Sequence, residues 1–79
     1  MTIEILGVDC KTSRLLRKNL EQALGGYKEP VELQCRYEPA KFIEYGLFSL
    51  PGLVIDGKLK SAGKLLSTQA IISMLNRDL

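Results

Sequence analysis

The chain has 79 residues, a formal net charge of +2 and 46% hydrophobic residues, which predict one small folded domain over residues 1–79. The 11 basic and 9 acidic residues form no run of like charge, so we expect no nucleic-acid partner. No apolar segment approaches the ~20 residues of a membrane span, and the start lacks a signal-like pattern. We therefore expect a cytoplasmic monomer without membrane contact.

Two cysteines and the absence of histidine restrict the chemistry that the chain can perform. Without a secretion signal, the two thiols are expected to be free in a reducing compartment. No Cys–His or Ser–His pair can form, and a zinc site would need both thiols together with carboxylates. We expect neither a metal nor a bound cofactor, and any chemistry should rest mainly on cysteine.

The first third of the chain predicts a strand followed by a helix. Residues 2–7 combine alternation with an apolar end and predict a strand that stops at Gly7. Residues 11–24 carry apolar side chains at helical spacing and predict an amphipathic helix. Residues 25–26 are both glycine, and we expect them to end this helix in the left-handed conformation.

The middle of the chain predicts a second strand and a short helix. Residues 31–37 alternate between apolar and polar side chains, which places Cys35 and Tyr37 on an apolar face. Cys35 is therefore expected to be an inert core thiol. Pro39 suits the first turn of a short helix, whose buried edge would come from Phe42, Ile43 and Leu47.

The last third predicts a hairpin and a final helix. The apolar triplet over residues 53–55 indicates a buried strand, and the Asp-Gly pair at 56–57 is a strong signal for a tight turn into a more polar strand. Ser67 can cap a final helix with one apolar stripe formed by Ala70, Ile71, Met74 and Leu75.

These elements predict an α/β fold with the order strand–helix–strand–helix–strand–strand–helix. A strand–helix–strand unit makes the first two strands parallel through a right-handed crossover. The hairpin adds two antiparallel strands to the same sheet. We therefore expect a mixed four-stranded sheet with helices on both faces.

Cys10 lies at the start of the first predicted helix, where unpaired N–H groups and the helix dipole favour a thiolate. Lys11 and Arg14 favour the thiolate, whereas Asp9 opposes it, so we expect a modestly lowered thiol pKa. Asp9, Lys11 and Thr12 are polar and place this turn at the surface. These features predict a reactive thiol, and the alternative is a small apolar residue buried at a strand end.

Ser13 lies one helical turn after Cys10, on the same side of the helix. Its hydroxyl or N–H can hydrogen-bond the Cys10 sulfur and stabilise the thiolate. The alternative is a serine that only favours helix initiation.

The segments "GVDCKTS" and "SLPGLVIDG", together with the order of the elements, resemble the thioredoxin-like superfamily. The likeness is greatest to small redox-active disulfide proteins of the thioredoxin/glutaredoxin-like type, and it spans Ile3 to about Leu75. Its most specific part is a Cys-x-x-(Cys/Ser) turn after the first strand combined with a proline before the third. The resemblance implies a minimal thioredoxin-like fold with strand order 2-1-3-4. The first and third helices would cover one face and the second helix the other.

The resemblance also implies a partner-binding loop. Pro51 matches a proline whose preceding peptide bond is cis in the family and whose loop faces the active cysteine. The backbone of Leu50 would then be free to pair with an extended partner segment. Gly63 resembles a glycine that lets a partner approach closely.

Ser13 departs from the family pattern, which usually has a second cysteine at this position. A serine cannot resolve a mixed disulfide. The chain is thus either a natural monothiol variant, which needs an external thiol such as glutathione to release Cys10, or the Cys-to-Ser form of a dithiol parent.

The resemblance favours a thiol–disulfide oxidoreductase that acts on protein or small-molecule disulfides and thiols, with Cys10 as its nucleophile. One alternative is a non-catalytic interaction module that retains the fold. A further alternative is a monothiol glutaredoxin-like protein that holds an iron–sulfur cluster or glutathione. Against it, Lys58, Lys60 and Lys64 fit solvated edge positions as well as glutathione contacts.

Overall fold

The computed structural model describes residues 1–8, 11–46 and 49–77. Strands and helices follow one another in the predicted order. Their bounds are β1 (Thr2–Leu6), α1 (Lys11–Leu24), β2 (Glu32–Arg36), α2 (Pro39–Glu44), β3 (Gly52–Ile55), β4 (Lys58–Ala62) and α3 (Thr68–Arg77). In the described part of the chain, no helix is long and apolar enough to cross a membrane.

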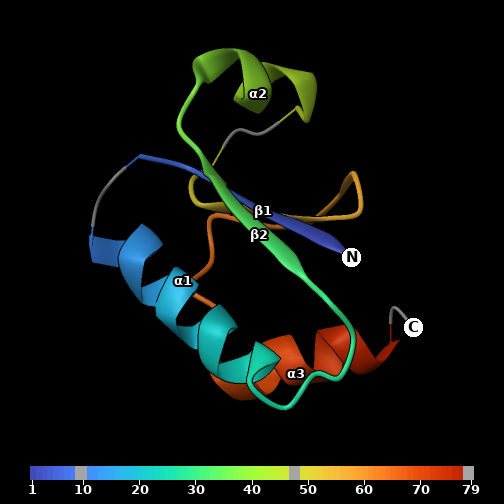
Figure 1. The fold of residues 1–79 in the computed structure, drawn as a ribbon. Helices are drawn as coiled ribbons and strands as arrows, with labels where there is room; N and C mark the ends of the chain where they lie inside the picture. The colour runs from blue at the N-terminus through green and yellow to red at the C-terminus, as the bar shows by residue number, and fades with distance from the viewer. Residues whose placement is uncertain (9–10, 47–48, 78–79) are drawn as a thin grey trace.

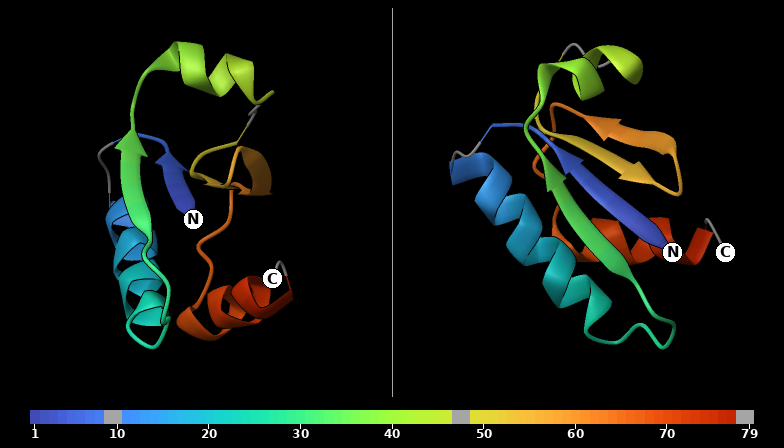
Figure 2. Two further views of the ribbon diagram at one scale, coloured as in Figure 1. Left: turned by 45° about the vertical axis from the view of Figure 1, so that its right-hand side comes forward. Right: turned by 45° about the horizontal axis from the view of Figure 1, so that its top comes forward.

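The four strands form one mixed sheet in the order β2-β1-β3-β4. β1 runs parallel to β2 and antiparallel to β3, and β3 pairs antiparallel with β4. α1 and α3 lie together on one side of the sheet, and α2 lies on the other (Figures 1 and 2). The predicted α/β fold and strand order are confirmed.

The core lies between the sheet and the pair α1 and α3. Alternate residues of β1 and β3 point to this side and meet apolar side chains from both helices. Burying each of these large side chains contributes about 1.5–3 kcal/mol. The members buried to 3% exposure or less are Ile3, Ile5, Leu16, Leu20, Leu53, Ile55, Ile71 and Leu75. Cys35 is a free, half-buried thiol that packs against this core from β2.

The other side of the sheet faces the short helix α2, and its residues Leu6 and Val54 are fully buried. α2 has six residues and none of them is buried, because a helix of less than two turns can present only part of its surface to the sheet. Phe42 is half-buried, but Ile43 is 80% exposed, so the predicted burial of Ile43 is wrong. Leu47 lies outside the described residues. The sheet is partly polar here, with Arg36 Nε 3.7 Å from Glu4 Oε2.

Three local expectations are corrected. α1 ends at Leu24 as predicted, but neither of the following glycines has a positive φ. Instead, the N–H of Gly25 donates to the carbonyl of Gln22 at 3.2 Å. This tight turn satisfies one of the last carbonyls of the helix without a left-handed residue. Tyr37 follows the end of β2 and is 45% exposed. Ala70 is also exposed, so the buried stripe of α3 rests on Ile71 and Leu75.

The hairpin and the cap of α3 are confirmed. Asp56 and Gly57 have φ values of 48° and 82°, the positive values that a tight two-residue turn requires. Ser67 Oγ accepts a hydrogen bond from the N–H of Ala70 at 3.1 Å, as an N-cap residue does.

Candidate functional site

Three segments meet at the end of β1 where the chain passes into α1. Gly7 is buried there, and its N–H donates to the carbonyl of Arg36 at 3.1 Å. A Cβ atom at this position would lie 2.9 Å from Ser13 Oγ and 3.6 Å from Pro51 Cα. The lack of a side chain at Gly7 therefore lets both α1 and the Pro51 loop approach the end of β1.

Ser13 is only 5% exposed, although it lies in the first turn of a surface helix. It shares the inward side of α1 with Leu16 and Leu20, because residues three, four and seven apart share a helix face. The hydroxyl thus points toward the interior junction between β1 and the Pro51 loop.

The loop before β3 forms the second side of the site. The Leu50–Pro51 peptide bond is cis. Pro51 is buried and its carbonyl accepts a hydrogen bond from the N–H of Gly63 at 2.9 Å. Leu50, by contrast, is 40% exposed and lies at the surface.

Gly63 is tightly constrained. Its φ is +72°, and a Cβ atom there would lie 2.7 Å from Ser49 Cβ. Both features require glycine. The family resemblance singles out Gly63 but not Ser49, because a small exposed serine in a loop carries no distinguishing signal. Gly7 was likewise interpreted only as a strand end.

The remaining predicted site residues lie around the start of α1. Lys11 and Thr12 are exposed in its first turn. Cys10 and Asp9 fall outside the described residues. The structure therefore brings Ser13 and Pro51 together at Gly7, joins Gly63 to Pro51 by a hydrogen bond, and leaves Lys11 and Thr12 at the adjoining surface.

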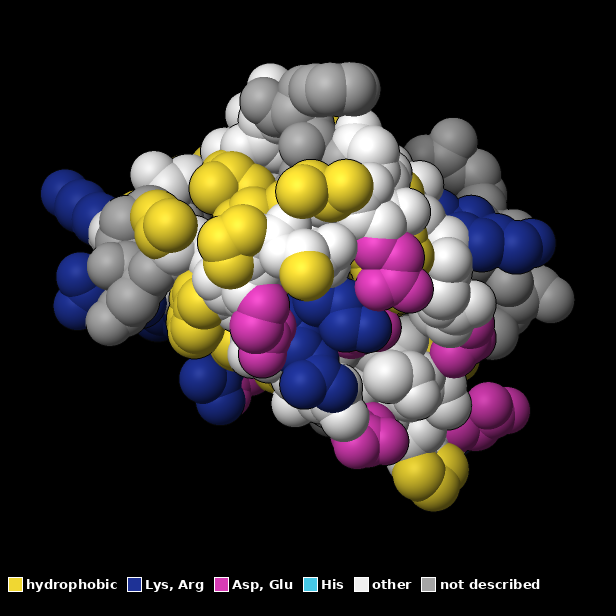
Figure 3. Space-filling model, turned by 90° about the horizontal axis from the view of Figure 1, so that it is seen from above, with side chains coloured by type: hydrophobic (Ala, Val, Ile, Leu, Met, Phe, Trp, Pro, Cys, Tyr) yellow, Lys and Arg dark blue, Asp and Glu magenta, His cyan; other side chains and the backbone are white. Residues whose placement is uncertain are grey.

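Exposed apolar side chains surround this end of the molecule. Val8 directly after β1 is 52% exposed, and Ile43 in α2 and Leu50 are exposed as well. Figure 3 shows hydrophobic side chains gathered on the upper face, where α2 lies. Contiguous exposed apolar surface is typical of a protein–protein contact.

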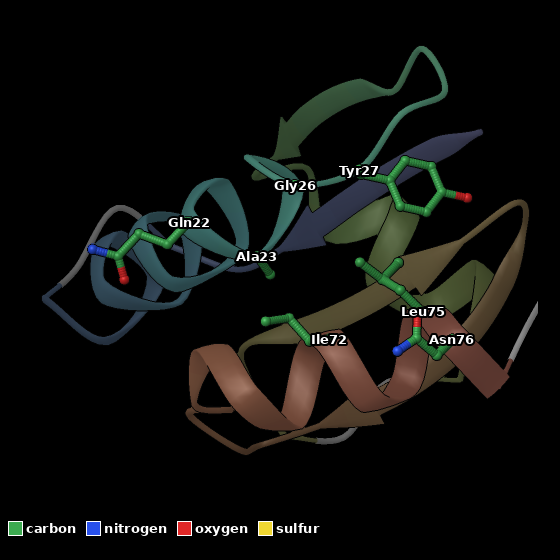
Figure 4. A pocket seen from close by; sticks show the side chains of 7 residues that line it. All are labelled: Gln22, Ala23, Gly26, Tyr27, Ile72, Leu75 and Asn76. Carbon is green, nitrogen blue, oxygen red and sulfur yellow. The ribbon is translucent and has the colours of Figure 1, made fainter.

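A separate cavity of about 200 Å³ lies between the C-terminal end of α1 and α3 (Figure 4). Its lining carries no thiol and no charged side chain: Gln22, Ala23, Gly26, Tyr27, Ile72, Leu75 and Asn76. Burial, with help from the carboxylates of Glu29 and Asp56, raises the pKa of the Tyr27 phenol. The cavity begins 11 residues along α1 from Lys11, about 16 Å at 1.5 Å per residue, so it is distinct from the site at β1.

Metal-ligating groups do not cluster in the described ranges. Among residues 1–8, 11–46 and 49–77, no three His, Cys, Asp or Glu side chains lie close enough together to hold a metal ion. The chemical features available at the site are thus the buried hydroxyl of Ser13, the loop with exposed Leu50 and buried Pro51, and the adjoining basic turn of α1.

Comparison with known proteins agrees with this arrangement. The family model described as "Thioredoxin domain" matches residues 1–76. A protein named thioredoxin from Methanothermobacter thermautotrophicus is 34% identical over 76 residues, which cover 96% of this chain and 99% of that protein. A solved structure titled "Structure of a malarial protein" superposes with a TM-score of 0.75 over 99% of this chain and 96% of that one. Its identity is 12%, so it supports the fold alone. The chain belongs to the thioredoxin domain family.

Proposed function

We propose that the protein is a monothiol thiol–disulfide oxidoreductase in which Cys10 is the nucleophile. The observation that carries the proposal is the convergence at Gly7. The buried hydroxyl of Ser13 and the cis-Pro51 loop both lie within 4 Å of the position that a Cβ atom would take at Gly7, three residues before Cys10 in the sequence. The thioredoxin family and the 34% identical relative support a thioredoxin-type redox protein.

The proposed reaction has two thiol–disulfide exchanges. The Cys10 thiolate attacks one sulfur of a protein or small-molecule disulfide, forms a mixed disulfide, and expels the other sulfur as a thiolate that takes a proton from solvent. An external thiolate, such as that of glutathione, then attacks the mixed disulfide and releases Cys10. In sum, the substrate disulfide and one external thiol give one substrate thiol and a new disulfide, which joins the external thiol to the other substrate sulfur.

Because position 13 is a serine and not a second cysteine, the exchange that releases Cys10 must use a thiol from another molecule. A hydroxyl at this position cannot form a disulfide with Cys10, but it can donate a hydrogen bond to the thiolate and lower its pKa. Its burial, at 5% exposure, favours a fixed position over a solvated one. Lys11 and the helix dipole act in the same direction, and Asp9 acts against them.

Leu50, Pro51 and Gly63 would position the partner. Leu50 is exposed, and its backbone would pair with an extended peptide, as in strand addition. Gly63 would let the partner approach closely, because it places no side chain next to Ser49. We place this activity in the cytoplasm, where thiols such as glutathione stay reduced and can complete the second exchange.

The test is mixed-disulfide formation with a glutathionylated peptide, followed by intact mass. We expect a Cys10 adduct that glutathione releases, no adduct in Cys10→Ala, and an unchanged rate in the matched variant Cys35→Ala. If the adduct rate were the same in Cys10→Ala, the nucleophile would be wrong. If the unsubstituted protein formed no adduct, and Cys10→Ala still bound a partner protein in a pull-down, the chain would be a non-catalytic interaction module.

A further inference from the structure

The charges of the chain are unevenly distributed. Four of the 11 basic residues lie in α1 and only one of the 9 acidic residues does, so this helix carries +3 and the rest of the chain −1. All four basic residues lie among the first eight of the 14 residues of the helix. Figure 3 shows Lys and Arg side chains gathered at the left edge, the side on which α1 begins in Figure 1.

Three of these side chains share the solvent-facing ridge of α1. Lys11, Arg14 and Lys18 are spaced i, i+3 and i+7, which places them on one helix face, and all three are exposed. Leu15 lies beside them and is 36% exposed. The ridge begins at the residue that follows Cys10. It therefore forms a basic surface next to the proposed nucleophile, and we call Lys11, Arg14, Leu15 and Lys18 the basic ridge.

Helix stability does not account for this placement. The N-terminus of a helix carries the positive end of the dipole, so acidic side chains stabilise the first turn and basic side chains stabilise the last. α1 has the reverse: its first turn contains no acidic residue and its last turn no basic one. Glu21 is the single acidic residue of α1, and its Oε1 lies 3.8 Å from Nε of Arg17. A helix face that was only solvated would gain from the opposite order.

We infer that the basic ridge is a docking surface for an acidic polypeptide segment of the disulfide partner. The inference rests on the proposed function, because the ridge adjoins Cys10 and would guide the partner's disulfide to it. A protein partner is favoured over nucleic acid, since the ridge includes exposed Leu15 and no aromatic side chain on which bases could stack. Attraction by such a surface acts mainly on the association rate.

The test compares two peptides with the same mixed disulfide, one flanked by glutamates and the other by glutamines. The measured quantity is the ratio of their rates of adduct formation at Cys10. Steering of this kind raises association rates by about 10-fold or more, and the ratio should fall toward one as salt shortens the Debye length from ~30 Å to ~8 Å. Lys18→Glu should lower the ratio several-fold. Lys28→Glu, an equal charge change at an exposed site beyond the far end of α1, should leave it unchanged.

The outcomes separate the two proposals. If both peptides form the Cys10 adduct but the ratio is near one, or falls equally in Lys18→Glu and Lys28→Glu, the docking surface is refuted and the oxidoreductase stands. If neither peptide forms the adduct, both proposals fail. If a DNA oligonucleotide binds the ridge more tightly than the acidic peptide does, and Lys18→Glu weakens that binding, the partner class is wrong.

Discussion

Gly63→Ala should be the most damaging conservative change at the site. The new Cβ atom would sit at a φ of +72° and 2.7 Å from Ser49 Cβ. A left-handed backbone costs a non-glycine residue about 1–2 kcal/mol, and forcing a methyl group into a filled space costs about 1–3 kcal/mol. We therefore expect a loss of about 2–5 kcal/mol in the free energy of unfolding. A chain of 79 residues has about 4–12 kcal/mol in total.

Two other glycines separate these contributions. Gly57 has a φ of +82°, but no atom of the described residues lies within 4 Å of the position that a Cβ atom would take there. Gly26 has no positive φ, and its Cβ position is equally clear of described residues. Gly57→Ala should thus lose only the ~1–2 kcal/mol of the backbone conformation, and Gly26→Ala should change stability by less than about 0.5 kcal/mol. Ser49→Gly added to Gly63→Ala should restore the part due to the contact.

Urea unfolding followed by circular dichroism measures all four variants. The reasoning is refuted if Gly63→Ala is no less stable than Gly57→Ala, or if Ser49→Gly restores nothing. The N–H of Gly63 donates to the carbonyl of Pro51, so a shift of the backbone at position 63 would also move the Pro51 loop. Gly63→Ala should therefore slow reaction with a peptide disulfide more than reaction with a small disulfide.

Three further predictions concern the fold around the site. Leu16→Ala should cost about 2–5 kcal/mol in urea unfolding because it empties a fully buried position, whereas Ile43→Ala, at 80% exposure, should cost less than about 0.5 kcal/mol; equal losses would contradict the assigned core. Ser67→Ala should cost about 0.5–2 kcal/mol because it removes the cap of α3, and an unchanged urea midpoint would show that the cap contributes nothing. The raised pKa of Tyr27 favours the neutral phenol in the folded state. The contribution of Tyr27 to the free energy of unfolding is therefore complete below the ordinary phenol pKa of 10.0 and is lost as pH rises through the raised pKa. Urea midpoints of the unsubstituted protein and Tyr27→Phe should therefore diverge above that pH, and parallel profiles would count against the shift.

The architecture was predictable because the hydrophobic pattern and the turn residues agree along most of the chain. The bounds of α1 match the prediction, Asp56 and Gly57 form the expected tight turn, and Ser67 caps α3. The failures lie where local pattern is ambiguous. Ile43 is apolar but lies in a helix too short to bury it, and Tyr37 continues the alternation of β2 past the point where pairing ends.

The site was predictable only in part. The resemblance identified Pro51 and Gly63 through the spacing of a Cys-x-x-Ser turn and a proline. The close approach of Gly7 to Ser13 was not predictable, because it depends on how β1, α1 and the loop before β3 pack together. The order of charges on α1 could be read in the sequence, but only the structure shows that Lys11, Arg14 and Lys18 are all exposed.

The central claim is that Cys10 is the reactive thiol, and its alkylation rate as a function of pH tests this most directly. Using the folded protein with intact-mass detection, we expect Cys10 to react first, with a rate that titrates below the ~8.5 of a free thiol. In Ser13→Cys, disulfide reduction should rise, since a second thiol can resolve the mixed disulfide. Equal alkylation of Cys10 and half-buried Cys35, or protection of Cys10, would contradict the account.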